Sequence, residues 1–455
     1  MENNTLQENK MGTMPIGKLL LSMALPMAAS MLVQALYNIV DSIYVSRLSE
    51  SALSAVSLAF PVQNIMVALG CGTAVGLNAT VSRSLGAKRP DEVDRFAGAG
   101  LFIGFAAMLL TVAFGLFFSR SYFAWQTRDA EIIAHGRDYL FWITVVSFGN
   151  YAQVLGERLL CSTGKTLYSM VSQITGAVIN IILDPILIFG KFGLPAMGTA
   201  GAAIATVIGQ IIAACIAFGF NLTVNRELHL RIRYIFRPHM RFIKDILVIS
   251  IPSMIMLMVS SVMNFGMNQI LLSFTSTAVA VFGVYYKLQS FVFMPVFGLN
   301  NAMVPIISYN YGAARRGRIM QTIKLAVLYA CCLMAVGLLL FMTIPNVLLS
   351  FYNASETMQA IGQPALRLTS IAFLFAGYCI VLGSVFQALG NGVYSLVCSV
   401  VRQIVVLLPV AYLLSLSGNL NLVWLAFPIA EIASVSVSTF LFRKLYKSKI
   451  AGIPE

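Results

Sequence analysis

The sequence predicts an all-α membrane protein with twelve transmembrane helices, arranged as two six-helix lobes related by a pseudo-two-fold axis along the membrane normal. Three observations lead to this class. The 455-residue chain is 58% hydrophobic and only 10% charged, which leaves too little polar surface for a water-soluble globule. Its apolar runs reach or exceed the roughly 20 residues that a helix needs to cross a bilayer. The chain also matches itself at a constant shift of 226 residues.

The internal repeat runs without gaps through most of each half. At this shift Asn38-Ile-Val-Asp41 falls on Asn264-Phe-Gly-Met267, and Pro26 falls on Pro252. Duplicated helical bundles are common among transporters, whose substrate sites lie between the repeats. The repeat therefore predicts a carrier.

Twelve apolar runs are separated by charged residues or by Gly, Pro and Asn breaks. In the first half we expect spans at 19–45, 53–80, 96–118, 134–160, 167–190 and 198–220. In the second half we expect them at 243–271, 277–306, 320–343, 362–387, 393–417 and 421–442. These spans predict an N-terminal lobe at 1–220, a cytoplasmic linker at 221–242 and a C-terminal lobe at 243–455.

The basic residues mark alternate loops. They precede the first span, follow the second and the eighth, fill the 221–242 linker and end the chain. Because positively charged loops stay on the cytoplasmic side, both termini and the linker should be cytoplasmic. Six spans per half bring both halves into the membrane in the same orientation, which predicts a central cleft between parallel lobes. The net charge of +13 therefore indicates membrane-flanking loops and not a nucleic-acid partner.

Several kinds of catalytic or metal site are excluded by the pattern. The seven cysteines lie in or beside apolar runs without CxxC or Cys/His spacing, so we interpret them as free thiols, and the three histidines lie in loops. Ser162-Thr-Gly-Lys-Thr166 resembles the end of a phosphate-binding loop, but Leu159 stands where that motif needs glycine. We expect no enzyme, no cofactor and no metal centre, and transport that draws on a gradient of H⁺ or Na⁺.

Three acidic residues lie clearly inside predicted spans: Asp41, Asp184 and Glu431. Each costs about 2.5–3.5 kcal/mol at the middle of a membrane, so a functional reason is expected. Glu157 and Asp245 lie near span ends, and we interpret them as side chains that reach the membrane interface.

Asp41 and Asp184 each complete a polar stripe on one helix face. The first stripe comprises Gln34, Tyr37, Asn38 and Asp41, and the second comprises Gln173, Asn180 and Asp184. Residues three, four or seven positions apart share a helix face, so the stripes predict a polar cavity in the N-terminal lobe. The alternative is that these amides only make hydrogen bonds between helices.

Two carboxylates in a medium of low dielectric constant cannot both stay ionised at low cost, so the pair could carry protons. With Asn180 and a hydroxyl as further oxygen ligands, it could equally hold a sodium ion. The repeat supplies an internal control, because Asp41 falls on Met267 and Asp184 falls on Val410. Ion coupling is therefore expected in the first lobe.

Glu431 needs a partner in the C-terminal lobe, and Arg402 is the only basic residue that we place clearly inside a span of that half. Counted from the cytoplasmic ends of their spans, the two differ in height by about 7–8 Å at 1.5 Å per residue, which two long side chains can bridge. We expect an ion pair that lines the lobe or braces it. Pro26 lacks an amide donor within the first span, which makes it either a hinge or a fixed kink.

The chain resembles the multidrug and toxic compound extrusion (MATE) family over essentially its whole length. The stretches that carry the resemblance are 37–48, 180–185 and 201–206, with echoes in Tyr311-Gly-Ala and Gln387-Ala-Leu-Gly390. The resemblance implies proton- or sodium-driven export of bulky amphipathic compounds, many of them cationic.

The resemblance also implies a set of site residues. In the branch whose coupling acids lie in the first lobe, the matching positions are Asp41, Asn180 and Asp184, with Gln34, Tyr37 and Tyr139 around them and Thr206 as the candidate hydroxyl. Another branch has acids in spans seven and ten, where this chain has Asn264, Asn268 and Gln387. That departure argues against coupling in the second lobe.

The strongest alternative is a flippase for a lipid-linked saccharide, within the same superfamily. Such a carrier should line its cleft with several arginines to hold pyrophosphate, whereas Arg402 is the one that we place within a span. A membrane enzyme or a channel fits less well, since the sequence has no catalytic constellation and its repeat is asymmetric. We expect a monomer in the bacterial inner (plasma) membrane, in contact with lipid and with a small amphipathic or cationic substrate.

Overall fold

The computed structural model describes residues 8–352 and 354–454, and its regular structure is helical, with no strand among these residues. Ten of the helices are long and apolar enough to cross a membrane. An eleventh span results when α14 (Glu356–Ser370) and α15 (Ala372–Ala388), which are bent by 46° relative to each other, are taken together. The protein is therefore an all-helical membrane protein with many spans.

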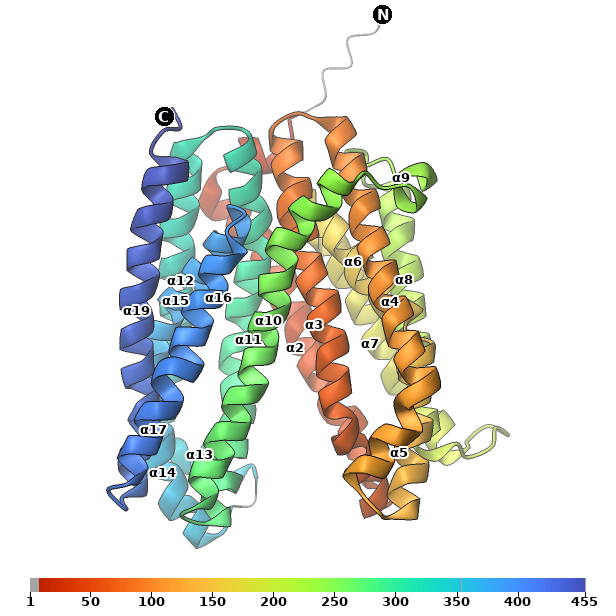
Figure 1. The fold of residues 1–455 in the computed structure, drawn as a ribbon, viewed down its shortest axis with the longest axis vertical. Helices are drawn as coiled ribbons and strands as arrows, with labels where there is room; N and C mark the ends of the chain where they lie inside the picture. The colour runs from red at the N-terminus through yellow and green to blue at the C-terminus, as the bar shows by residue number, and fades with distance from the viewer. Residues whose placement is uncertain (1–7, 353, 455) are drawn as a thin grey trace, which may run out of the picture. The chain divides into compact units, whose positions relative to one another are not determined.

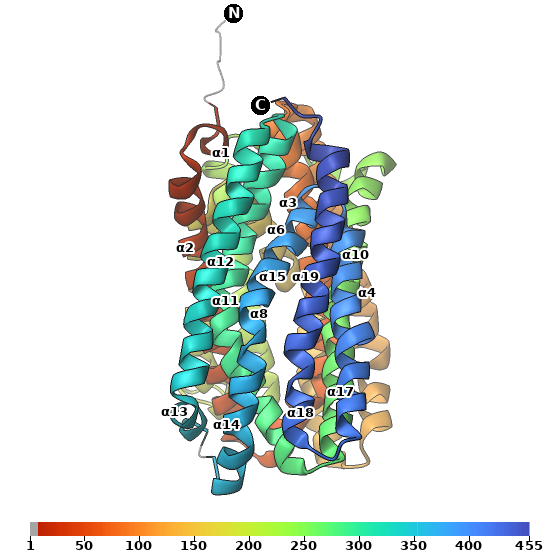
Figure 2. The same ribbon diagram turned by 90° about the vertical axis from the view of Figure 1, so that its left-hand side faces the viewer.

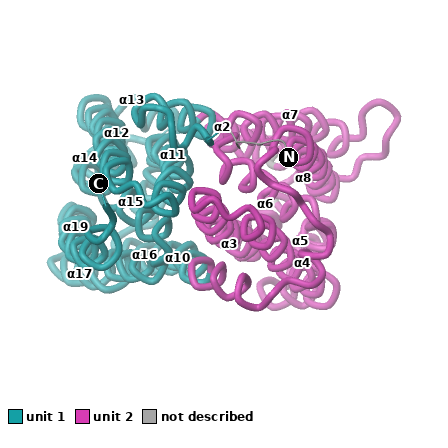
Figure 3. Tube along the Cα trace, turned by 90° about the horizontal axis from the view of Figure 1, so that it is seen from above, with its two compact units in different colours: residues 1–28, 251–455 teal, residues 29–250 magenta. Residues whose placement is uncertain are grey.

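The helices belong to two compact units (Figure 3). One consists of residues 29–250, and the other consists of residues 251–455 together with the chain up to Ala28. The divisions fall inside α2 (Ile16–Ser46) and α10 (Met240–Leu272), close to Pro26 and Pro252. Because the internal repeat relates these two prolines, the division follows the repeat, and each of the two helices contributes to both units.

The unit of residues 29–250 contains most of the first repeat (Figure 1). Besides parts of α2 and α10 it comprises α3 (Glu50–Gly86), α4 (Pro90–Gln126), α5 (Ala130–Val145), α6 (Phe148–Ser162), α7 (Thr166–Phe189), α8 (Gly198–Thr223) and α9 (Ile232–Phe236). Side-chain caps fix two helix starts, since Ser49 accepts from the amide of Ala52 and Asp129 accepts from the amide of Glu131. The helices α3, α4 and α8 extend beyond the expected spans, since hydropathy marks only the apolar part of each.

The span expected at 134–160 is divided between α5 and α6, and neither helix reaches the length of a span alone. The break falls at Val146 and Ser147, where β-branched and hydroxyl side chains weaken the helix. Directly after the break, a Cβ atom at Gly149 would lie 2.9 Å from the backbone nitrogen of Ile211, so α6 starts in close contact with α8.

The unit of residues 251–455 contains the second repeat. Besides part of α10, α14 and α15 it comprises α11 (Ser276–Gly312), α12 (Arg316–Thr343), α13 (Pro345–Ser350), α16 (Gly392–Val400), η1 (Val401–Leu407), α17 (Leu408–Ser415), α18 (Leu420–Trp424), α19 (Ala426–Leu445) and η2 (Tyr446–Ile450), and it also includes α1 (Lys10–Thr13) and the start of α2. Within this unit α12, α15 and α19 lie side by side (Figure 2). The span expected at 393–417 changes to π-helix over η1, and Pro409, which has no amide N–H to offer the carbonyl four residues earlier, follows directly.

Candidate ion-coupling site

Small residues let α7 and α8 approach closely. A Cβ atom at Gly209 would lie 2.7 Å from the carbonyl oxygen of Gly176, and one at Gly176 would lie 2.8 Å from the Cβ of Ala213. Larger side chains at these positions would push the helices apart. Small residues are common where membrane helices touch, because close backbone contact is a main source of their attraction. The close packing brings Thr206 on α8 against Asn180 on α7.

Asn180 connects Asp184 with Thr206. Its Nδ2 atom donates hydrogen bonds of 3.3 Å to Oδ1 of Asp184 and 3.2 Å to Oγ1 of Thr206. The Thr206 hydroxyl donates in turn to the backbone carbonyl of Ala202, at 3.0 Å. Asn180 is 3% exposed and Asp184 is 0% exposed, so this polar group is buried within the unit. The two hydrogen bonds orient the side-chain amide of Asn180 with its Nδ2 atom toward Asp184 and Thr206.

The polar face of α2 meets this group. Nε2 of Gln173 on α7 donates a 3.1 Å hydrogen bond to Oε1 of Gln34 on α2. Further along α2, Tyr37 interacts with Gln34 and lies within electrostatic reach of Asp41 and Asp184. The two carboxyl groups also lie within electrostatic reach of each other. The structure thus brings the two polar stripes together.

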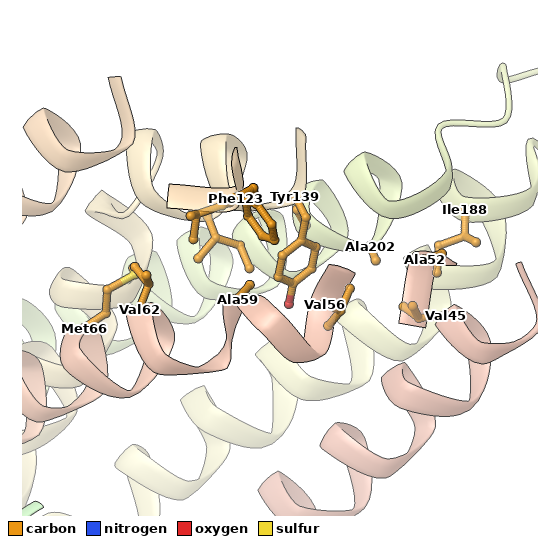
Figure 4. Packing of buried hydrophobic residues seen from close by; sticks show 13 residues of the cluster. Val45, Ala52, Val56, Ala59, Val62, Met66, Phe123, Tyr139, Ile188 and Ala202 are labelled. Atoms are coloured by element: carbon orange, nitrogen blue, oxygen red, sulfur yellow. The ribbon is translucent and has the colours of Figure 1, made fainter. Parts of the chain in front are cut away.

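Tyr139, which α5 contributes, packs within an apolar cluster. Its ring lies next to Phe123 and faces α3 (Figure 4). The ring is buried, and its hydroxyl accepts a 2.9 Å hydrogen bond from Nε2 of Gln63. The hydroxyl is also within electrostatic reach of Asp41 and Asp184. The structure thus ties the Tyr139 hydroxyl to α3 through Gln63, and its part in the ion-coupling network stays a prediction.

Three oxygen atoms at this site have no hydrogen-bond partner among the described residues: Oδ1 of Asp41, Oδ1 of Asn180 and Oδ2 of Asp184. A buried oxygen without a partner costs free energy, and a bound proton or cation relieves that cost. Oxygen atoms of carboxylates, amides and hydroxyls are the ligands that hard cations prefer, so these residues fit Na⁺ as well as H⁺. We call Asp41, Asn180, Asp184 and Thr206 the acid cluster.

A small cavity lies beside the acid cluster. Its volume is about 40 Å³, and its polar lining includes Gln34, Tyr37, Gln153, Gln173, Asn180 and Thr206. That space is enough for a water molecule, and the lining offers several hydrogen-bonding groups. The cavity gives Asn180 and Thr206 a polar surrounding.

Asn38, which was expected at the site, and Pro26, which was expected as a hinge or a kink, have no contact with the acid cluster that the structure shows. The side chain of Asn38 is exposed, and its backbone carbonyl accepts a 2.9 Å hydrogen bond from the hydroxyl of Ser42. Successive residues are about 100° apart around a helix, so the partial burial of Tyr37 does not bury its neighbour. Pro26 lies within α2, which continues through it as one helix.

The interpretation of Glu157 as a side chain at the membrane interface is wrong. Glu157 is 8% exposed, and its Oε1 accepts hydrogen bonds from Nε2 of Gln153 at 3.0 Å and from Oγ of Ser172 at 3.4 Å. Gln153 also lines the small cavity beside Asn180, so this third acid is joined to the site through one side chain. The spacing of four between Gln153 and Glu157 is the signal that could have indicated a shared buried face.

Arg402 and Glu431 meet in the unit of residues 251–455, where Nη1 of Arg402 donates a 3.1 Å hydrogen bond to Oε1 of Glu431.

The expectation that Arg402 is the only basic residue inside a span of that half is wrong, because Lys287 lies within α11. Its ammonium group sits 5.9 Å from the centre of the Tyr352 ring, in the connection after α13. Such a contact with an aromatic face lets a lysine remain charged near a membrane boundary.

Comparisons with known proteins agree with this architecture. The sequence profile of the MatE family matches residues 26–186 and 252–413, one stretch in each repeat. The multidrug export protein MepA of Staphylococcus aureus (strain MRSA252) is 26% identical over 412 residues, which cover 90% of each chain. MepA of Staphylococcus haemolyticus (strain JCSC1435) is 25% identical over 433 residues, which cover 94% of each chain. The crystal structure of MATE in complex with MaL6 has a TM-score of 0.90 at 24% identity, covering 98% of this chain and 99% of that one.

The all-helical fold, its many spans and the two matched repeats define a multi-span membrane protein with the fold of the MATE structures. The chain belongs to the MatE family.

Proposed function

We propose that the protein is a secondary active antiporter that exports amphipathic, often cationic, drugs or toxic compounds in exchange for protons or sodium ions. The observation that carries the proposal is the acid cluster, in which Asp41, Asn180 and Asp184 each keep one oxygen atom without a hydrogen-bond partner among the described residues. The similarity to proteins named as multidrug exporters supports the direction of transport and the class of substrate.

An ion at the acid cluster would act on two helices at once. Asp41 belongs to α2, whereas Asn180 and Asp184 belong to α7. A proton on one carboxyl group, or a sodium ion shared among the three oxygen atoms, removes repulsion between the two acids and favours their close approach. An ion that binds one arrangement of α2 more tightly than another can shift the carrier between them, and Pro26 is our candidate for the hinge.

We further propose that the protein lies in the bacterial plasma membrane as a monomer, with both termini and the 221–242 segment on the cytoplasmic side. The basic residues of that segment support the orientation. The segment is also packed against the start of α4, where Oδ1 of Asp94 accepts a 2.8 Å hydrogen bond from the backbone amide of His229.

Uptake into proteoliposomes tests the proposal and separates the two ions. Vesicles that contain the purified protein receive an inside-acidic pH gradient without sodium, or an inside-high sodium gradient at constant pH, and ethidium uptake is followed by fluorescence. We expect at least one gradient to drive uptake and its dissipation by an ionophore to stop it. Uptake under neither gradient would overturn the proposal, and movement of a lipid-linked saccharide without either gradient would favour the flippase.

A further inference from the structure

The unit of residues 251–455 contains a cavity of about 310 Å³ around the Arg402–Glu431 pair. Its walls come from α10, α11, α15, η1 and α19, all within this unit. Sites for small molecules have volumes of about 300–1,000 Å³, so the cavity is large enough for a compact organic compound. The proposed coupling mechanism uses neither the cavity nor the ion pair.

The internal repeat places this cavity at the same position in its half as the small polar cavity beside the acid cluster. The shift of 226 residues takes Gln34, Tyr37, Gly176 and Ala177, which line the small cavity, onto Ser260, Met263, Arg402 and Gln403, which line the large one. The duplicated scaffold therefore holds two equivalent cavities with different volumes and linings. This difference points to different contents, an ion in one half and a larger compound in the other.

The ion pair offers both a donor and an acceptor to such a compound. The hydrogen bond to Glu431 uses Nη1 of Arg402, which leaves Nε and Nη2 of the planar guanidinium as donors. Oε2 of Glu431 has no hydrogen-bond partner among the described residues, although the residue is only 9% exposed. The thiol of Cys379 lies near this carboxylate, and a thiol is a weak donor.

The net charge of the pair selects among ligands. Arg402 and Glu431 together are neutral, so a ligand with a net charge would bring an uncompensated charge into a site of low dielectric constant. A zwitterion adds no net charge, and each of its charged groups meets the opposite charge of the pair. The cavity therefore suits a zwitterion better than a simple cation or anion.

The rest of the lining indicates an aromatic ligand. Tyr286, Phe293 and Phe427 line the cavity, and aromatic faces pack well against flat rings and alkylammonium groups. Arg402 and Gln403 enter from η1, and short π-helical segments are rare and frequent at functional sites. The aromatic walls are independent of the ion pair and agree with it.

We propose that this cavity binds aromatic zwitterionic compounds, with Arg402 binding their anionic group and Glu431 binding their protonated amine. Assigning these compounds as export substrates rests on the function proposed above, whereas their binding requires no ion gradient.

Three related fluorescent probes test the proposed selectivity. Nε-dansyl-lysine is a zwitterion, its methyl ester is a cation, and its Nα-acetyl derivative is an anion, all with the same aromatic group. Binding to the purified full-length protein in lipid nanodiscs is measured by dansyl fluorescence. We expect the zwitterion to bind at least about tenfold more tightly than either derivative, as the loss of one charge-assisted hydrogen bond implies. Equal or tighter binding of the ester or of the anion would overturn the proposed ligand class.

Variants locate the binding. Ser260→Phe narrows the cavity and keeps the ion pair, and the double variant Arg402→Gln/Glu431→Gln removes both charges without leaving one unpaired. Both should weaken binding of the zwitterion by about tenfold or more. Lys287→Gln is the matched control, since this charged residue of α11 faces the Tyr352 ring and does not line the cavity. Unchanged binding in Ser260→Phe and in the double variant would place the probe elsewhere and overturn the site.

A substitution in the acid cluster distinguishes binding at this site from the export function. Asp184→Asn should lose gradient-driven uptake and still bind the zwitterion as the unmodified protein does. Failure of every gradient to drive uptake, together with selective binding that Ser260→Phe abolishes, would overturn the antiporter and support the site.

Discussion

Nδ2 of Asn180 lies 3.2 Å from the hydroxyl oxygen of Thr206, on the following helix. Because the hydroxyl proton of Thr206 is directed to the carbonyl of Ala202, the hydroxyl acts as the acceptor. The amide of Asn180 is therefore held with Nδ2 toward Asp184 and Thr206, and its Oδ1 has no hydrogen-bond partner among the described residues. An oxygen fixed in this way is available to an ion without any rearrangement of the side chain.

Replacement of Thr206 tests this fixation. Thr206→Val keeps the shape and removes the acceptor, so it should raise the ion concentration for half-maximal uptake and lower stability by about 1 kcal/mol. Thr206→Ser keeps the hydroxyl and should stay close to the unmodified protein. Uptake as a function of ion concentration and thermal unfolding measure the two effects, and a valine variant that matches the serine variant in both would show that the bond has no role.

Asp41 should be essential for coupling. Asp41→Asn cannot change its protonation state and should lose gradient-driven export while the protein still inserts normally. The matched control is Asp138→Asn, which alters an exposed acid on α5. Ethidium export from cells and membrane protein levels are the measurements, and normal export by the Asp41 variant would refute the assignment.

The two halves should differ in their sensitivity to substitution. Asp184→Asn should damage transport severely, because it removes one of the two acids of the cluster. Met267→Ala and Val410→Ala, at the positions equivalent to Asp41 and Asp184, should leave most transport activity per folded protein, although loss of the buried Met267 side chain can reduce yield. Comparable loss of specific activity at all three positions would contradict coupling in the first half alone.

Arg402 and Glu431 should stabilise the unit of residues 251–455 through their interaction, and not as two independent side chains. Removing one charge leaves the other buried and unpaired, which can cost about 3–5 kcal/mol. Arg402→Met or Glu431→Gln should therefore lower the thermal stability of the purified protein, and the double variant should recover much of the loss. If the two single losses simply add, the side chains are not coupled and the interpretation fails.

The contact between α7 and α8 should tolerate no larger residue. Gly209→Ala places a Cβ atom 2.7 Å from the carbonyl oxygen of Gly176 and should cost about 1–3 kcal/mol and weaken the bond from Asn180 to Thr206. Gly219→Ala on the same helix meets nothing within 4 Å and should be neutral or slightly stabilising. Thermal unfolding of both variants tests this prediction. Equal melting temperatures would show that α7 and α8 can move apart without loss of stability.

Part of the site could be predicted from the sequence, since a carboxylate inside an apolar run is expensive and stands out. The helical period also predicts that Asn180 and Asp184 share a face, and in the structure Nδ2 of Asn180 lies 3.3 Å from Oδ1 of Asp184. The spacing of Gln153 and Glu157 indicates only that they share a helix face, and whether that face is buried depends on how α6 packs against its neighbours. The aromatic cavity was equally hidden, since five elements that are distant in sequence contribute to it.

The ends and breaks of helices were the least predictable part of the fold. The division between α5 and α6 depends on a few weak helix formers and on the contact of Gly149 with α8. The bend between α14 and α15 has no apolar or charged signal in the sequence around Ile371. Hydropathy shows where a segment can cross a membrane, whereas tertiary contacts decide where it bends.

The acid cluster includes two carboxyl groups, those of Asp41 and Asp184. Their number limits the stoichiometry of a proton-driven cycle, because each can carry one proton. In a cell without membrane potential, a tenfold proton gradient could then sustain a concentration ratio of about a hundredfold for a compound of no net charge, since each tenfold step corresponds to about 1.4 kcal/mol. Measured steady-state ratios above that limit would require a third proton carrier, and the buried Glu157 is the group to examine first.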